Sequence, residues 1–180
     1  MSLVSNLFLL FVAASVLVYY IVPHKFQWIV LLIFSYTYYI AGGPRYVVFI
    51  LFSTLVTWLM ALLIEKTEEK GNHKSAKRLL ILGLVLNFGM LGIVKYTNFA
   101  VENINALFHL NLKGMALLLP LGISFYTFQS SGYLLDVYWK RCKAERHPLK
   151  YALFVSFFPQ ILQGPIGRYD RLSKQFFKDH

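Results

Sequence analysis

Four polar side chains recur on one helical face of the long apolar stretch 115–137. Tyr126, Gln129, Tyr133 and Asp136 are offset by 3, 7 and 10 positions, which places them within a sector of about 80° at 100° per residue. Polar groups at membrane depth are costly and mark candidate sites. The face predicts either a polar wall along a substrate path or a hydrogen-bonded packing seam with Asp136 at headgroup level. In both cases we expect it to point into the helix bundle.

A second polar group follows the last apolar run, where two prolines and two glycines fall within residues 159–168. These residue types break a helix and free backbone amide and carbonyl groups. Such backbone is tolerated at membrane depth only where protein covers it or where it lines water. Gln160, Gln163 and Arg168 could satisfy those groups or meet a polar substrate. A simple turn at the membrane interface is the alternative interpretation.

Histidine is the commonest general base, but no histidine lies inside an apolar stretch beside a carboxylate. The five are His24, His73, His109, His147 and His180. The sequence also has no glycine-rich phosphate loop, no Gly-x-Ser-x-Gly elbow and no His-x-x-x-His pair. The single cysteine, Cys142, excludes an internal disulfide and a multi-cysteine metal site. The residues themselves therefore indicate no catalytic group and no metal.

Long uncharged runs must position these side chains. Hydrophobic residues make up 57% of the chain and charged residues 14%, against roughly 25% charged in soluble globular proteins, and the mean hydropathy is +0.55. The composition predicts an all-α polytopic membrane protein that forms one membrane domain over residues 1–180. We expect about five transmembrane helices, at 3–22, 26–41, 46–64, 79–94 and 115–137.

Two further segments are expected to be helical without crossing the bilayer. Apolar residues recur at near-helical spacing over 99–108, which is typical of an interfacial amphipathic helix. The apolar run 151–162 is only 12 residues long and contains Pro159. It is too short to cross as a straight helix, so we expect it to be re-entrant or interfacial.

The charges predict an orientation. The net charge of +10 comes from Lys and Arg at segment ends and in short connections, which argues against a nucleic-acid partner and favours the lipid bilayer. Stretches 65–78 and 138–150 each carry five Lys and Arg residues. The positive-inside rule places both in the cytoplasm and the N-terminus outside. A re-entrant last run returns the basic tail to the cytoplasm.

Several motifs resemble those of the membrane-bound O-acyltransferases. The closest branch is that of the bacterial alginate O-acetylases and the teichoic-acid D-alanyl transfer proteins. The motifs are LPLGISFYTFQ at 119–129, YLLDVY at 133–138, YALFVSFFPQ at 151–160 and QGPIGRY at 163–169. Two shorter segments, GPRY at 43–46 and KYTNFAVEN at 95–103, fit the same branch. The resemblance is collinear over essentially the whole chain.

The resemblance implies a multi-pass plasma-membrane enzyme with packed helices around a funnel. It implies transfer of an acyl group, most simply acetyl, from a cytoplasmic thioester donor to a hydroxyl of a cell-surface polysaccharide. The thioester is a co-substrate, so no bound cofactor is expected, and other cell-envelope acetylation proteins are expected partners.

In that family the active histidine lies downstream of these motifs, so the chain resembles the N-terminal portion. We therefore carry over no catalytic residue and expect no acyl transfer from these 180 residues alone. The polar residues on 115–137 and 159–168 would form part of the funnel wall and its cytoplasmic mouth. An inactive remnant, a membrane scaffold or a transport subunit are the alternatives.

Overall fold

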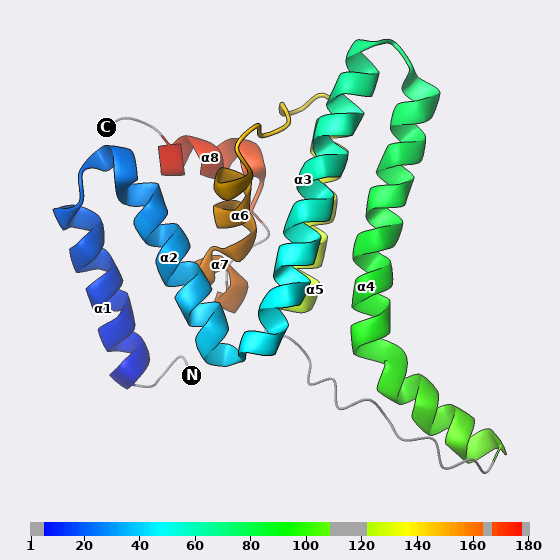
Figure 1. Cartoon of the computed structure of the whole chain (residues 1–180), viewed down its shortest axis with the longest axis horizontal. Helices are drawn as coiled ribbons and strands as arrows, with labels where there is room; N and C mark the ends of the chain where they lie inside the picture. The colour runs from blue at the N-terminus through cyan, green and yellow to red at the C-terminus, as the bar shows by residue number, and fades with distance from the viewer. Residues whose placement is uncertain (1–5, 109–121, 164–166, 178–180) are drawn as a thin grey trace.

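The computed structural model describes residues 6–108, 122–163 and 167–177, and every regular element in these ranges is a helix, as the composition predicted. The chain order is shown in Figure 1. The elements are α1 (Asn6–Ile21), α2 (His24–Gly42), the short 3-10 helix η1 (Pro44–Tyr46), α3 (Val47–Glu69), α4 (His73–Phe108), α5 (Ile123–Tyr138), α6 (Pro148–Ser156), α7 (Phe158–Gln163) and α8 (Tyr169–Phe177).

The first two helices form an antiparallel pair whose connection is held by one side chain. The amide nitrogen of Gln27 donates to the backbone carbonyl of Tyr19 at 3.1 Å, near the end of α1. This bond satisfies a carbonyl that has lost its own helical partner. At the other end of α2, Gly43 adopts a φ of 146°, and a Cβ there would lie 2.5 Å from the Tyr46 ring. Glycine is therefore required where the chain turns into α3.

Helices α3, α4 and α5 form a closely packed three-helix unit. In Figure 1, α3 and α4 run side by side and α5 lies behind α3, where it contacts both. Close approach depends on Gly83 of α4, because a Cβ there would lie 2.9 Å from Leu134 Cδ1 and 3.3 Å from Met60 Cβ. The side chains of Ile50, Ile64 and Leu134 are fully buried in this unit.

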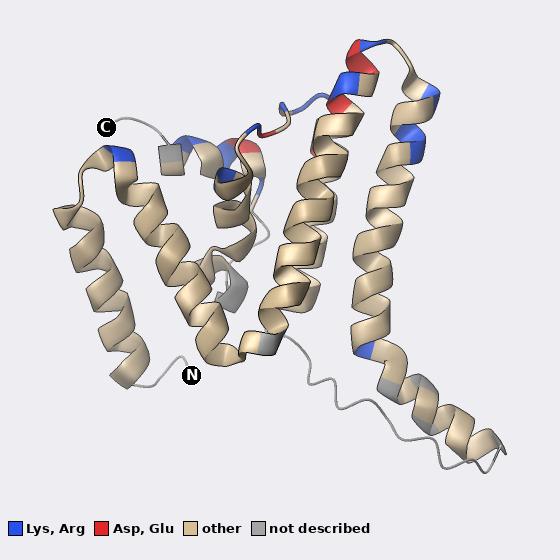
Figure 2. Ribbon diagram, viewed as in Figure 1, with Lys and Arg blue, Asp and Glu red and all other residues tan. Residues whose placement is uncertain are grey.

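The chain after α5 enters the bundle and returns to the same end. Helix α6 packs against α2 and α3 and is followed by the short α7, and α8 then lies across the end from which α6 started (Figure 1). Most Lys, Arg, Asp and Glu side chains gather at this end (Figure 2), which we call the charged end; it contains residues 65–78, 139–147 and α8. Residues 151–162 thus lie in α6 and α7 and the chain comes back in α8, whereas their re-entrant position relative to a membrane stays a prediction.

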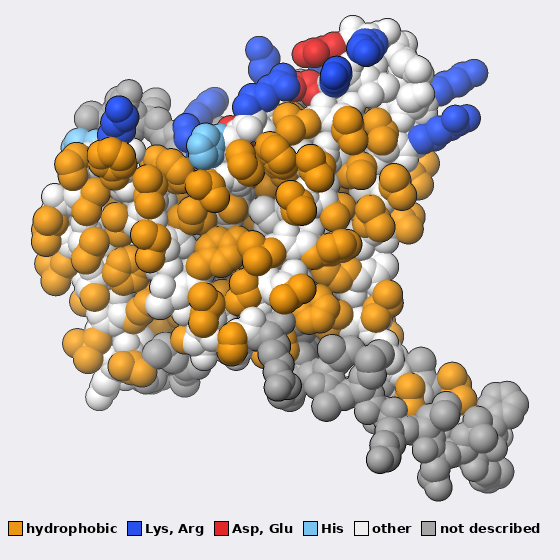
Figure 3. Space-filling model, viewed as in Figure 1, with side chains coloured by type: hydrophobic (Ala, Val, Ile, Leu, Met, Phe, Trp, Pro, Cys, Tyr) orange, Lys and Arg blue, Asp and Glu red, His pale blue; other side chains and the backbone are white. Residues whose placement is uncertain are grey.

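Two of the described helices are long and apolar enough to cross a membrane, namely α3 and residues His73–Thr97 of α4. In each, only 33% of the most apolar 18-residue window is buried, and hydrophobic side chains cover much of the face seen in Figure 3. Helix α1 is apolar but shorter, at 16 residues. The all-helical class is therefore confirmed, whereas the arrangement with five spans stays a prediction.

Two expected boundaries differ from the structure, and a third lies partly outside the described residues. The charged stretch 65–78 is mostly helical, because α3 continues to Glu69 and α4 begins at His73, so the connection is short. Residues 99–108 continue α4 and do not form a separate interfacial helix. The ribbon of α4 changes direction in its last third (Figure 1), where the Thr97 hydroxyl donates to the Ile93 carbonyl, a contact that often bends helices. The helix expected over 115–137 is described only from Ile123, since residues 109–121 lie outside the described ranges.

Candidate functional site

The polar face of α5 points into the bundle, as the sequence analysis expected. Tyr126 is 0% exposed, Gln129 1% and Tyr133 2%, whereas Phe128 on the opposite face is 48% exposed. The ring of Tyr126 packs against Tyr39 of α2 with centroids 6.4 Å apart. These side chains are thus in contact with other helices and not with the outer surface of the molecule.

Gln129 lies against the break between α6 and α7. Helix α6 ends at Ser156, and Pro159 cannot supply the backbone N–H that would continue it. In an uninterrupted helix the Phe158 amide would donate to the Phe154 carbonyl. Instead it donates to the Ser35 hydroxyl at 3.3 Å, and the Gln129 side-chain amide donates to the Phe154 carbonyl at 3.1 Å. Side chains from α2 and α5 therefore satisfy the backbone groups that the break releases.

The same amide nitrogen of Gln129 donates to the Gln160 side-chain oxygen at 3.2 Å, which joins one residue from each of the two predicted polar groups. The Gln129 Oε1 atom is buried and has no hydrogen-bond partner among the described residues. A Cβ at Gly167 would lie 2.1 Å from the Gln160 amide nitrogen, so this glycine permits the close approach of the returning chain. Within the described residues, Gln129 Oε1 is thus a buried acceptor at this site that is left over for a further hydrogen bond.

Tyr133 belongs to a second cluster, nearer the charged end. Its ring contacts those of Tyr151 and Tyr169, with centroids 4.7 Å and 5.0 Å away. Its hydroxyl accepts a hydrogen bond from the Glu145 backbone amide at 2.8 Å, while the Tyr169 hydroxyl donates to the Glu145 carboxylate. This aromatic cluster ties α5, α6 and α8 to the loop between α5 and α6.

Asp136 and Arg168 meet at the charged end. One carboxylate oxygen of Asp136 lies 3.5 Å from Arg141, and the other lies 3.4 Å from Arg168. The arginine side chains are 55% and 44% exposed, so these pairs are screened by solvent. Burial, and then the nearby Asp136 carboxylate, raises the pKa of the Cys142 thiol to about 12. The polar face of α5 is therefore divided into an uncharged inner part, with Tyr126 and Gln129, and an ionic outer part, with Asp136.

The sequence analysis missed two acidic residues that hold the basic loop in place. Glu65 accepts hydrogen bonds from the Ala144 amide at 3.0 Å and from the Arg146 guanidinium at 2.6 Å. Glu68 pairs with His73 at 2.7 Å and with Lys140 at 3.2 Å. The available signal was the position of both carboxylates at the end of a predicted span, opposite the five basic residues of the stretch 138–150.

The sequence analysis also missed a buried amide network between α3 and α4. Asn87 is 1% exposed; its oxygen accepts from the Ser53 hydroxyl at 2.6 Å, and its nitrogen donates to the Thr57 hydroxyl at 3.0 Å and the Gly83 carbonyl at 2.9 Å. An asparagine in the middle of a predicted span is itself a signal for a helix–helix contact. This network is saturated, which distinguishes it from the Gln129 site.

Some predicted features lie apart from this site. The side chain of Gln163 falls outside the described residues, and so does His109. Within the described ranges, no three His, Cys, Asp or Glu side chains form a group that could hold a metal. His147 contacts Trp28 at the charged end, with ring centroids 5.7 Å apart.

Comparison with known proteins gives several relatives. A probable alginate O-acetylase of Pseudomonas syringae pv. tomato is 35% identical over 177 residues, which is 96% of this chain and 34% of the relative. That of Pseudomonas aeruginosa is 34% identical, with the same shares. A peptidoglycan O-acetyltransferase of Helicobacter pylori is 34% identical over 83% of this chain and 32% of the relative. No family model and no solved structure matches the chain.

The similarity extends over nearly the whole chain but over a limited part of each relative. It includes α5, the break between α6 and α7, and the return to α8, since the matched region covers 96% of the chain. The chain spans about a third of the length of the curated relatives that it matches. Over that third, the chain is homologous to alginate O-acetylases and to a peptidoglycan O-acetyltransferase.

Proposed function

We propose that this chain forms the N-terminal part of a membrane-bound O-acyltransferase that moves an acyl group, most simply acetyl, onto a cell-surface polysaccharide. The observation that carries the proposal is the homology over 96% of the chain to alginate O-acetylases. The donor would be a cytoplasmic thioester, used as a co-substrate, and the acceptor a sugar hydroxyl. A general base takes the hydroxyl proton as the oxygen attacks the thioester carbonyl, and the thiolate leaves. That base would come from the part of the enzyme that this chain does not cover.

In this proposal, the described residues build one side of the substrate path. Tyr126, Gln129 and Gln160 supply polar groups inside an otherwise apolar bundle, and Gln129 Oε1 is left available to a hydroxyl donor. Tyr133 holds the inner wall against the cytoplasmic loop. Asp136 and Arg168 stand at the mouth, where the chain returns from the membrane.

A chimeric enzyme tests the proposal directly. Residues 1–180 would replace the homologous third of the Pseudomonas syringae alginate O-acetylase, and polysaccharide-bound acetyl would be measured in cells that lack the native enzyme. We expect the chimera to restore acetylation. A matched chimera carrying Gln129→Leu and Gln160→Leu is expected to reach the membrane but to acetylate less. A chimera that is abundant in the membrane yet inactive would contradict the proposal.

The proposed topology has five spans with the N-terminus outside and both basic stretches, 65–78 and 138–150, in the cytoplasm. It is supported by the common location of these stretches at the charged end (Figure 2). Single cysteines at Lys74 and Lys174, introduced into a Cys142→Ser background, are expected to resist an impermeant maleimide in intact cells and to react after lysis. Labelling of either residue from outside would refute the orientation.

A further inference from the structure

A lateral groove lies between α2 and α3 and is floored by α6. The two helices meet at the Gly43 turn, and α6 packs against both of them. The groove has a volume of about 400 Å³, within the roughly 300–1,000 Å³ range of small-molecule sites. Its walls include Leu32 and Ile33 of α2 and Leu51 and Leu55 of α3, and Leu149 of α6 lies on the floor.

Two tryptophans lie where the groove meets the charged end. Trp58 lines the groove and donates its indole N–H to the Glu145 carbonyl at 2.9 Å. Trp28 contacts His147, which directly precedes the lining residues Pro148 and Leu149. Indole rings with one apolar and one polar edge favour the membrane–water interface. The rings thus mark the level at which a lipid headgroup would lie.

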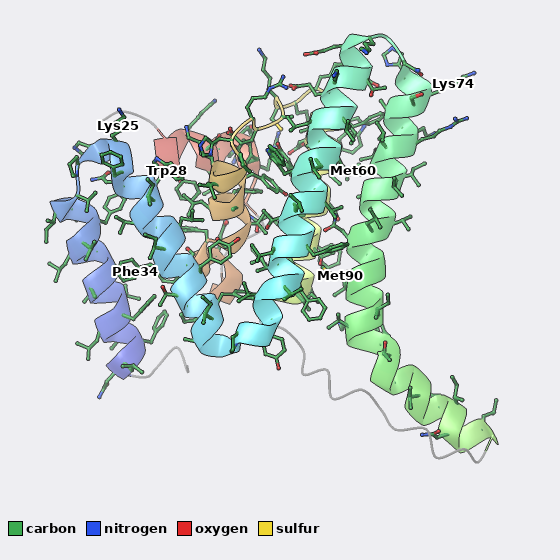
Figure 4. All side chains as sticks on the ribbon, viewed as in Figure 1. Lys25, Trp28, Phe34, Met60, Lys74 and Met90 are labelled. Atoms are coloured by element: carbon green, nitrogen blue, oxygen red, sulfur yellow. The ribbon has the colours of Figure 1, made fainter. Side chains whose placement is uncertain are left out.

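Two lysines are close in sequence to the residues at the charged end of the groove, which we call its mouth. Lys25 is one helical turn before Trp28 on α2, is exposed and makes no ion pair within the described residues (Figure 4). Lys150 follows Leu149 on the floor helix. The acidic groups nearby are already engaged, because Glu145 accepts from Tyr169 and from the His147 amide, and Glu65 pairs with Arg146. Arg146 offsets the charge of Glu65, so Lys25 and Lys150 outnumber the remaining carboxylate, Glu145, and leave the mouth with a net positive charge.

A second groove allows the two linings to be compared. It lies between α3 and α4, has a similar volume of about 430 Å³, and is lined by apolar residues such as Val48, Phe52, Val85 and Ile93 and by Gly89. None of its lining residues is charged or aromatic with a polar edge. Both grooves could accept an acyl chain, but the groove between α2 and α3 also offers cations and interfacial indoles.

We propose that the groove between α2, α3 and α6 binds one anionic phospholipid, with an acyl chain along Leu32, Leu51 and Leu55 and the phosphate beside Lys25 and Lys150. The site is independent of the acyl-transfer proposal, since none of its lining residues belongs to α5 and it needs no acyl donor. Charge complementarity selects the anionic headgroup, and the apolar walls hold the chain.

Native mass spectrometry of the full chain in detergent, with equal phosphatidylglycerol and phosphatidylcholine, tests this site. We expect one phosphatidylglycerol to be retained in preference. Lys25→Gln and Lys150→Gln are each expected to weaken its retention about fivefold, in line with the attraction of one lysine to an anionic lipid. The control variant with Lys74→Gln and Lys77→Gln removes two cations from the start of α4, away from the groove, and is expected to retain the lipid (Figure 4).

A second pair of variants tests the position of the acyl chain. Leu55 is 56% exposed and Val85 is 60% exposed, so a tryptophan at either position is accommodated on the outer surface. Leu55→Trp fills the groove between α2 and α3 and is expected to abolish preferential retention, whereas Val85→Trp fills the control groove and is not. The proposal would be overturned by equal retention of phosphatidylcholine, by an equal loss in the control variant and in the Lys25 and Lys150 variants, by retention in Leu55→Trp, or by the absence of any bound lipid.

Discussion

Two buried amide side chains, Asn87 and Gln129, are equally hidden from solvent, at 1% exposed, but their surroundings differ. Asn87 joins two uninterrupted helices, and both its oxygen and its nitrogen are bonded within the described residues. Gln129 lies where a helix is broken, donates to a released backbone carbonyl and keeps an oxygen that has no partner in the part of the chain that the structure describes. We call the contact between α3 and α4 around Asn87 the regular seam. We call the contact between α5 and the α6–α7 break around Gln129 the irregular seam.

The difference separates packing from possible function. A saturated polar network fixes the register of two helices and has nothing left to offer a ligand. A broken helix with unspent hydrogen-bonding groups is tolerated inside a membrane protein only where it is covered or lines a path. A buried amide thus serves packing at the regular seam, whereas at the irregular seam it keeps an acceptor that a ligand could use. The following substitutions test this difference.

The largest effect is expected at the irregular seam, from Gln129→Leu. The substitution leaves the Phe154 carbonyl buried without its donor, which costs about 1–3 kcal/mol. We expect a lower midpoint in thermal unfolding of the purified chain and a larger loss of acetylation in the chimera than of membrane level. Phe128→Leu, on the exposed side of the same helix, is the control and should change neither. If Gln129→Leu left acetylation unaltered, the irregular seam would serve packing alone, as the regular seam does.

Gly83→Ala tests the tight packing beside the regular seam. The added methyl would lie 2.9 Å from Leu134 Cδ1, and such overpacking costs typically about 1–3 kcal/mol. The control is Gly89→Ala, where nothing lies within 4 Å and the better helix propensity of alanine stabilises by up to about 1 kcal/mol. We expect opposite shifts of the unfolding midpoint. Equal shifts would show that α4 does not approach α3 and α5 as described.

Asn87→Leu is expected to have a smaller effect on stability. Interhelical hydrogen bonds in membrane proteins contribute about 0.6 kcal/mol each on average, and the Ser53 and Thr57 hydroxyls can turn to carbonyls of their own helix. The expected loss is about 1 kcal/mol, with acetylation by the chimera in proportion to the folded amount. Asn103→Leu, which removes an exposed bond within one helix, serves as the control. Loss of acetylation without loss of folded protein would give the regular seam a functional role.

Asp136→Leu should have the smallest effect on stability, at most about 1 kcal/mol, because its arginine partners are about half exposed. It releases Arg168, which stands where the chain returns toward α8, so we expect acetylation by the chimera to fall more than its membrane level. Asp136→Glu is expected to restore the pairing. If the chimera with Asp136→Leu still acetylates, Asp136 is an interfacial anchor and the irregular seam does not extend to it.

The features that depend on local sequence were predictable. The spacing of Tyr126, Gln129 and Tyr133 fixes their common face, and Pro159 fixes the break in the last apolar run. Contacts across helices were not predictable, because the bonds from Asn87 to Ser53 and from Glu65 to Arg146 join residues 34 and 81 positions apart. The helical continuation through 99–108 was also missed, since a polar face alone does not end a helix.

The bonds of Asn87 also bear on how the protein enters the bilayer during synthesis. Helix α4 alone would present an amide to lipid, whereas the hydroxyls that satisfy it belong to α3, which leaves the ribosome first. The turn between them is short and follows three glutamates and two lysines. A hairpin that inserts as one unit never exposes that amide to hydrocarbon, so the translocon would release α3 into lipid only together with α4.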